Sequence, residues 1–311
     1  MSLAPEKPTP PAHILDALIN RIGQVVLGKE RQIRLALACL LARGHLLIED
    51  LPGVGKTTLA HVLARVLGLQ FKRIQFTSDL LPADILGVSI YQPDTKAFMF
   101  HPGPLFAQLV LADEINRASP KTQSALLEAM EERQVTAEGL THKLPEPFFV
   151  IATQNPHHLI GTYPLPESQL DRFLMRIEMG YPDRAAERAL LKGRDRRELL
   201  ELLQPVISTD KLSGLQQLAA RVHVAEPLLD YVQNLLEATR HTADFTEGLS
   251  PRAGLALLAA ARAWALLATR DMVLPEDVQA IAPSVIGHRL RSAIGGRAVS
   301  VARLIESVPI P

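Results

Sequence analysis

Short apolar runs and longer helical patterns alternate along the chain as far as Pro182. Runs of consecutive apolar residues bounded by turn-forming residues predict buried strands. These strands are expected at residues 45–49, 71–76, 109–113 and 148–153, with a less regular one at 173–179. Helical spacing predicts two helices between His13 and Ala42, and further helices at residues 56–68 and 120–134. This alternation predicts an α/β fold, in which a parallel five-stranded sheet carries helices on both faces.

The pattern changes after Pro182, where the strand-like runs stop. Helical spacing takes over at residues 183–193, 228–241 and 251–271. We therefore expect a boundary at this point, between an α/β domain at residues 13–182 and an all-α domain at residues 183–311. Residues 1–12 are rich in proline and are expected to form a flexible tail.

Composition and charge narrow the class of protein. The 33 basic residues balance 33 acidic ones, so no overall field attracts nucleic acid, and we expect no nucleic-acid partner. Cys39 is the only cysteine, which excludes an internal disulfide and fits a reducing compartment. The most apolar segments are interrupted by arginine and fall short of a membrane span. With no secretory signal pattern at the start, we expect a cytoplasmic protein.

A phosphate-binding pattern follows the first predicted strand and opens a predicted helix. The segment DLPGVGKT at residues 50–57 matches GxxxxGK[ST], except that Asp50 stands where the first glycine is usual. Glycines let the backbone turn its N–H groups toward a phosphate, Lys56 reaches the β- and γ-phosphates, and Thr57 offers a hydroxyl to Mg²⁺. The residues expected to line ATP in this segment are Pro52, Gly53, Val54, Gly55, Lys56, Thr57 and Thr58.

Two carboxylates follow the third predicted strand. Asp113 and Glu114 come directly after an apolar run, where a buried strand would end. In an open α/β sheet that edge binds ligands, so both acids are expected beside the phosphate loop. We assign Asp113 to the magnesium ion, and Glu114 to orienting the attacking water or accepting its proton.

Several longer segments carry a family resemblance. They are DEINRASPKTQSALLEAMEERQVT at residues 113–136, ATQNP at 152–156, LPESQLDRFLMR at 165–176 and SPRA at 250–253. In this order they resemble the MoxR family of AAA+ ATPases over nearly the whole chain. MoxR proteins in turn are similar to the ATPase subunits of magnesium chelatase. The resemblance implies an AAA+ P-loop NTPase core followed by an α-helical lid domain.

Further site residues follow from this resemblance alone. It implies that Asn155 senses the γ-phosphate and positions water, and that Arg252 is a second sensor which touches the phosphate of the same subunit. Arg172 matches the arginine finger that reaches into the next subunit, with Arg176 as a rival. Val26 and Gly28 match the loop that surrounds adenine.

Two hairpins are also expected. Residues 85–108 resemble the insertion that interrupts the second helix in this branch of AAA+ proteins, and the alternation around QPDTK predicts a hairpin. A second hairpin is predicted at residues 134–150, with residues 138–143 as its turn. In AAA+ relatives such hairpins face the pore or the client protein.

The resemblance implies a function as well. It points to an ATPase that converts ATP and water to ADP and phosphate, assembles as a ring, expected to be a homohexamer, and remodels or activates partner proteins. A protein with a von Willebrand factor A domain is an expected partner, whereas no residue names the client. Two alternatives stay open: a motor subunit for metal insertion of the magnesium-chelatase type, and a slow nucleotide-gated scaffold.

Overall fold

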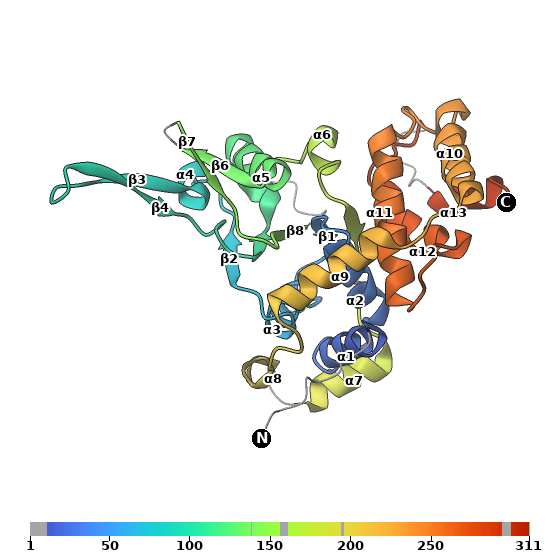
Figure 1. The fold of residues 1–311 in the computed structure, drawn as a ribbon, viewed down its shortest axis with the longest axis horizontal. Helices are drawn as coiled ribbons and strands as arrows, with labels where there is room; N and C mark the ends of the chain where they lie inside the picture. The colour runs from blue at the N-terminus through green and yellow to red at the C-terminus, as the bar shows by residue number, and fades with distance from the viewer. Residues whose placement is uncertain (1–10, 138, 156–160, 194–195, 294–299, 311) are drawn as a thin grey trace, which may run out of the picture.

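Five parallel strands form the central sheet. The computed structural model describes residues 11–137, 139–155, 161–193, 196–293 and 300–310. The strands lie in the order β2–β5–β8–β1–β9 and all pairs are parallel. Their bounds are β1 Leu46–Glu49, β2 Phe71–Gln75, β5 Leu109–Asp113, β8 Phe149–Gln154 and β9 Met175–Ile177. The predicted five-stranded parallel sheet is confirmed (Figure 1).

Helices cover both faces of this sheet, as the apolar runs predicted. In β1, Leu46 and Ile48 belong to one buried cluster while Leu47 belongs to another, because successive side chains of a strand point to opposite faces. The first cluster includes helices α1 Pro11–Gly23, α2 Glu30–Leu41 and α3 Lys56–Val66. The second includes α4 Pro82–Leu86 and α5 Pro120–Glu132. Residues 1–10 of the expected tail lie outside the described residues, and α1 begins at Pro11.

The part of the chain after β9 is helical. Its helices are α7 Arg184–Lys192, α8 Arg196–Leu202, α9 Thr209–Arg221, α10 Glu226–His241, α11 Pro251–Leu267, α12 Pro275–Ile286 and α13 Val301–Ser307. The predicted patterns at α7, α10 and α11 are confirmed, whereas α8, α9, α12 and α13 were not predicted. Pro283 lies inside α12, and a proline within a helical pattern normally indicates the end of a helix. No described helix is both long and apolar enough to cross a membrane.

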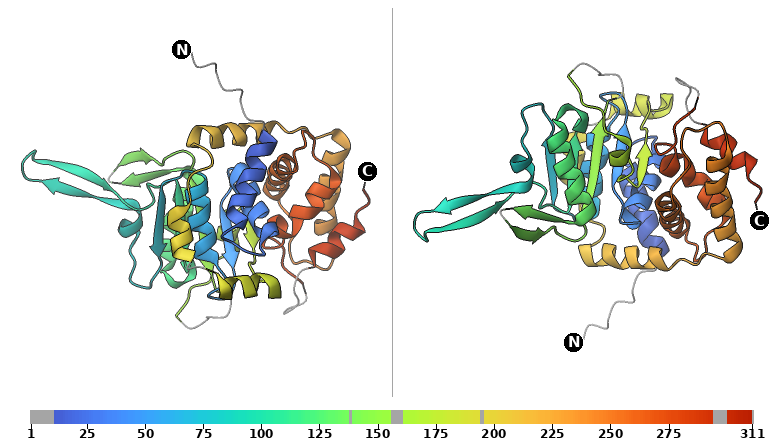
Figure 2. Two further views of the ribbon diagram at one scale, coloured as in Figure 1. Left: turned by 90° about the horizontal axis from the view of Figure 1, so that it is seen from below. Right: turned by 90° about the horizontal axis from the view of Figure 1, so that it is seen from above.

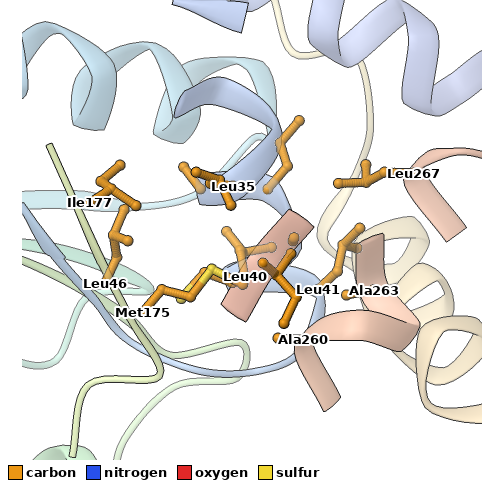
Figure 3. Close-up of a cluster of buried hydrophobic side chains, with 14 of the residues drawn as sticks. Leu35, Leu40, Leu41, Leu46, Met175, Ile177, Ala260, Ala263 and Leu267 are labelled. Atoms are coloured by element: carbon orange, nitrogen blue, oxygen red, sulfur yellow. The ribbon is translucent and has the colours of Figure 1, made fainter. Parts of the chain in front are cut away.

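The C-terminal helices share a hydrophobic core with the sheet. Figure 3 shows Ala260 and Ala263 of α11 beside Leu40 and Leu41 of α2. Met175 of β9 lies next to Leu40, on the side away from these alanines. Alanines at this position let the two helices approach closely. The docking of α11 on α2 therefore fixes where α11 begins relative to the sheet.

Two antiparallel hairpins extend from the end of the molecule opposite helices α10–α13 (Figure 2). The longer one pairs β3 Gly87–Gln92 with β4 Ala97–Pro102, which confirms the hairpin predicted around QPDTK. The shorter one pairs β6 Gln134–Ala137 with β7 Leu140–Lys143. The prediction that residues 138–143 form a turn was wrong, because residues 140–143 form the returning strand. Its polar and mostly exposed side chains gave no apolar run to find.

Candidate nucleotide-binding site

The phosphate loop connects β1 to α3 with an open inner surface. Gly53 and Gly55 have φ angles of 83° and 94°, in the left-handed region that favours glycine. A Cβ atom added at either position would meet no atom within 4 Å, so space for a ligand adjoins the backbone. Pro52 is exposed, Val54 packs against the core, and Thr57 and Thr58 are half-buried in the first turn of α3. The loop therefore offers backbone N–H groups at a helix N-terminus, where an anion is stabilised.

Lys56 is the first residue of α3 and faces the acidic residues of the site. Its Nζ donates a hydrogen bond to the backbone oxygen of Asp50 at 2.5 Å. Burial lowers the pKa of the Lys56 ammonium below its usual value. Three nearby carboxylates oppose that shift, namely those of Asp50, Asp113 and Glu114. The structure thus brings the predicted lysine and both predicted acids together.

Asp113 ends β5 and is held by residues from both neighbouring strands. Its Oδ1 accepts a 2.6 Å hydrogen bond from the hydroxyl of Thr153 in β8. Its Oδ2 accepts hydrogen bonds from the Arg73 guanidinium in β2, at 2.7 Å from Nη2 and 3.1 Å from Nε. Sequence patterns missed both partners, since only the order of the strands places them beside Asp113.

Glu114 follows directly and adopts a left-handed conformation, with φ of 57°. Its N–H donates to the Thr153 hydroxyl at 2.9 Å, so one buried hydroxyl holds both acidic residues. The Glu114 carboxylate accepts hydrogen bonds from Gln75 at 3.1 Å and from Arg117 at 3.0 Å. About a third of this side chain is exposed, which leaves it accessible to water.

Asn155 comes out of β8 beside the phosphate loop. It follows Gln154, whose backbone oxygen accepts a 3.1 Å hydrogen bond from the Asp50 N–H. Its side chain is buried. The predicted position at the carboxyl edge of the sheet therefore agrees with the structure, whereas its contact with a γ-phosphate stays a prediction.

Asp50 has a contact that the glycine usual at its position could not make. Its Oδ2 accepts a 2.6 Å hydrogen bond from the N–H of Gly180, and its Oδ1 accepts one from Leu51 at 2.7 Å. Gly180 lies just after β9, where the chain leaves the sheet for α7. The side chain thus joins the phosphate loop to the segment that leads into the C-terminal helices.

The expected adenine loop contacts the same segment. Gly28 lies between α1 and α2, and a Cβ atom added there would be 2.8 Å from the Cβ of Ala186 in α7. Lys29 donates a 2.7 Å hydrogen bond to the backbone oxygen of Tyr181. Val26 is buried in the core. These contacts bring the loop close to the segment that Asp50 holds, and a role in binding adenine stays a prediction.

Arg172 and Arg252 lie together at the opposite edge of the sheet. Arg172 Nε is 3.2 Å from a carboxylate oxygen of Glu131, and Arg252 Nη2 is 2.8 Å from the other oxygen of that carboxylate. Two residues after Arg172, the Leu174 N–H donates to the backbone oxygen of His45, at the amino end of β1.

The six residues from His45 to Asp50 span about 16 Å in an extended strand. Arg252 was expected to touch the phosphate of its own subunit. In this structure it pairs with Glu131 at the amino edge, and its contact with a phosphate stays a prediction.

Arg176 has a different environment from Arg172. It lies within β9 and forms a 2.9 Å ion pair with Glu49 of β1. About a third of its side chain is exposed. The two candidate arginines are therefore separated, with Arg176 held inside the sheet and Arg172 at its amino edge.

A parallel sheet in this strand order, with a phosphate loop after β1 and an acidic pair after β5, defines a P-loop ATPase core with a helical lid. The family model described as "ATPase family associated with various cellular activities (AAA)" matches residues 45–175, and the AAA lid domain matches residues 237–307.

Relatives narrow the class further. The chain is 40% identical to Chaperone MoxR1 of Mycobacterium tuberculosis, over 96% of this chain and 83% of that protein. It is 34% identical to Protein MoxR of Paracoccus denitrificans, over 86% of each. The crystal structure of a candidate ATPase from Cytophaga hutchinsonii superposes with a TM-score of 0.85 at 37% identity, covering 96% of this chain and 93% of the other. The chain belongs to the MoxR family of AAA+ ATPases, and it binds and hydrolyses ATP.

Proposed function

We propose that this ATPase hydrolyses magnesium-ATP at interfaces of a ring and uses the turnover to remodel or activate partner proteins. The observation that carries the proposal is the division of the site between two edges of the sheet. Lys56, Asp113 and Glu114 meet at the carboxyl edge, while Arg172 and Arg252 lie at the amino edge. One subunit thus has binding and water-activating groups at one edge and guanidinium groups at the other.

The residues at the carboxyl edge fit a triphosphate with its metal. The open loop at Gly53 and Gly55 provides room for phosphate, and Lys56 provides the cation. The Thr57 hydroxyl and the Asp113 carboxylate are the hard oxygen donors that Mg²⁺ prefers, and the ion would neutralise negative charge on the phosphates.

Glu114 would orient a water molecule or accept its proton, with its backbone fixed by Thr153. Asn155 can donate and accept hydrogen bonds at the same edge.

A ring of copies, proposed as a homohexamer, brings the two edges together. In a closed ring each subunit presents one surface to the next, so the amino edge of one copy can face the nucleotide of its neighbour. Guanidinium groups supplied in this way stabilise the charge of the transition state. Arg172 suits this role better than Arg176, because Arg172 precedes β9 at the amino edge whereas Arg176 lies within that strand.

The proposed partners rest on relatives rather than on a contact in this chain. One relative carries the name Chaperone MoxR1, which supports action on other proteins. A protein with a von Willebrand factor A domain remains the proposed partner by family resemblance, and the client is not identified. A chelatase motor would show ATPase activity stimulated by chelatase subunits and a porphyrin. A slow scaffold would release its partner faster than it hydrolyses ATP.

A pair of variants tests the assignment of Lys56 and Glu114. We expect Lys56→Ala to abolish tight binding of ATP, and Glu114→Gln to keep binding while hydrolysis stops. Calorimetric titration with ATP and a phosphate-release assay measure the two properties separately. Full hydrolysis by the Glu114→Gln protein would contradict the role of Glu114, and unchanged binding by Lys56→Ala would contradict that of Lys56.

A further inference from the structure

A network of ion pairs joins the sheet domain to the C-terminal helices at the amino edge. The Glu131 carboxylate contacts Arg172 at 3.2 Å and Arg252 at 2.8 Å. Asp171 contacts Arg252 at 3.7 Å and Arg289 at 2.6 Å. Three guanidinium groups therefore share two carboxylates, and the network has an excess of positive charge.

Within this network, Glu131 connects Arg172 and Arg252, the two arginines proposed to face the nucleotide of the neighbouring subunit. It lies in the last turn of α5, while Arg172 follows α6 Glu167–Leu170 and Arg252 is in the first turn of α11. Arg172 is fixed further by a 2.7 Å hydrogen bond from its Nη1 to the backbone oxygen of Leu127. Each of the two carboxylate oxygens of Glu131 contacts a different arginine, so the two guanidinium groups are held side by side.

Both arginines retain donors for a further ligand. Among the described residues, Nη2 of Arg172 and Nη1 of Arg252 donate no hydrogen bond. The side chains are 31% and 54% exposed, so the pair is accessible from outside the subunit. Arg289 differs, because it is 6% exposed and its donors reach Asp171 and backbone oxygens. Arg289 therefore supports the network, whereas Arg172 and Arg252 face outward.

We propose that Glu131 is a positioning residue, which holds Arg172 and Arg252 as one unit so that both meet the phosphates of a neighbouring subunit together. The inference rests on the proposed function, in which these arginines act across the interface. Two guanidinium groups repel each other, and the attraction of a carboxylate between them offsets that repulsion. Glu131 provides that carboxylate without using the outward donors, and it links an arginine of the sheet domain to an arginine of the C-terminal helices.

The charge of Glu131 is tested with Glu131→Gln, which keeps the size of the side chain. Glu132→Gln is the matched control, since Glu132 is the next residue of α5 and is exposed. For Glu131→Gln we expect a fall in kcat of about tenfold to a hundredfold, the cost of a small misplacement of a catalytic group. The dissociation constant for ATP should not change, and the thermal midpoint should fall by no more than a few degrees, because exposed ion pairs contribute about 1 kcal/mol or less. Glu132→Gln should match the parent protein in all three.

Coupling between the arginines separates positioning from a general structural role. Arg172→Ala, Arg252→Ala and the double variant are compared with the parent, first with Glu131 present and then in the Glu131→Gln protein. With Glu131 present, the loss of kcat in the double variant should be at least about tenfold smaller than the product of the single losses, because the pair acts as a unit. In the Glu131→Gln background the losses should multiply.

A mixing experiment keeps this inference distinct from the proposed function. Arg172→Ala protein mixed with Lys56→Ala protein should regain activity at mixed interfaces, where an intact phosphate loop faces an intact arginine. If neither Arg172→Ala nor Arg252→Ala protein regains activity when mixed with Lys56→Ala protein, action across the interface is overturned, and the inference with it. Regain together with equal coupling in both backgrounds would overturn the role of Glu131 alone, as would a kcat of Glu131→Gln equal to that of the control.

Discussion

The Thr153 hydroxyl should matter for both stability and hydrolysis. Thr153 is fully buried in β8, and its Oγ1 donates to Asp113 and accepts from the Glu114 N–H. Replacement by valine keeps the branched shape and β-propensity but removes both hydrogen bonds. Thr153→Ser keeps the hydroxyl and is the matched control.

The cost of Thr153→Val follows from these two contacts. A hydrogen bond to an ionised carboxylate contributes about 1.5–3 kcal/mol, and a neutral one about 0.5–1.5 kcal/mol. Since the Glu114 N–H and Asp113 would lose their shared partner in a largely buried place, we expect a loss of about 2–4 kcal/mol in unfolding free energy. Hydrolysis should also slow by about tenfold to a hundredfold, because the hydroxyl sets the positions of both acids.

Urea unfolding and steady-state ATPase measurements on Thr153→Val, Thr153→Ser and the parent protein check both numbers. Thr153→Ser should lose less stability than Thr153→Val and should keep most of the activity. If Thr153→Val unfolds at the urea concentration of the parent and hydrolyses ATP at the same rate, the hydroxyl does not organise the acidic pair. A loss of stability without a loss of kcat would limit its role to folding.

Two further predictions concern charge. Arg73→Gln removes the cation bound to Asp113, so we expect divalent metal to bind more tightly with nucleotide present, by up to about fivefold for an ion pair near the surface. Titration with Mn²⁺ followed by electron paramagnetic resonance measures this affinity. An unchanged affinity would contradict competition between Arg73 and the metal ion. Burial lowers the pKa of His45 from 6.5 to about 4, so the folded protein resists protonation that the unfolded chain accepts. The contribution of His45 to the unfolding free energy should therefore be full above pH 6.5 and should fall by about 3 kcal/mol as the pH drops toward 4. Urea unfolding at several pH values should show a shallower decline of the unfolding free energy in His45→Gln than in the parent protein. An equal decline would exclude His45 as a source of the pH dependence.

The sheet and the phosphate loop were predictable because their signals are local. Each buried strand is a short apolar run, and the loop is a contiguous pattern that needs glycine at positive φ. Asp113 and Glu114 could be assigned because they directly follow such a run. The catalytic roles given to them remain predictions, whereas their proximity to Lys56 is a structural fact.

The partners of these residues were not predictable, since they come from distant parts of the chain. Thr153 and Arg73 approach Asp113 only because β8 and β2 flank β5 in the sheet. For the same reason, Arg252 could not be placed beside Glu131 from the sequence. Its position depends on how α11 docks on α2 through small side chains, which no local pattern encodes.

Helix α5 connects the two edges on which the proposed mechanism depends. It begins at Pro120, after the short turn Ile115–Arg117 that follows Glu114, and it ends at Glu132. Ser119 caps its first turn by accepting a hydrogen bond from the Thr122 N–H. Its 13 residues span about 20 Å. Because a packed helix of this length is rigid, Glu114 and Glu131 keep a fixed separation, and each subunit of the proposed ring would present both edges in constant register.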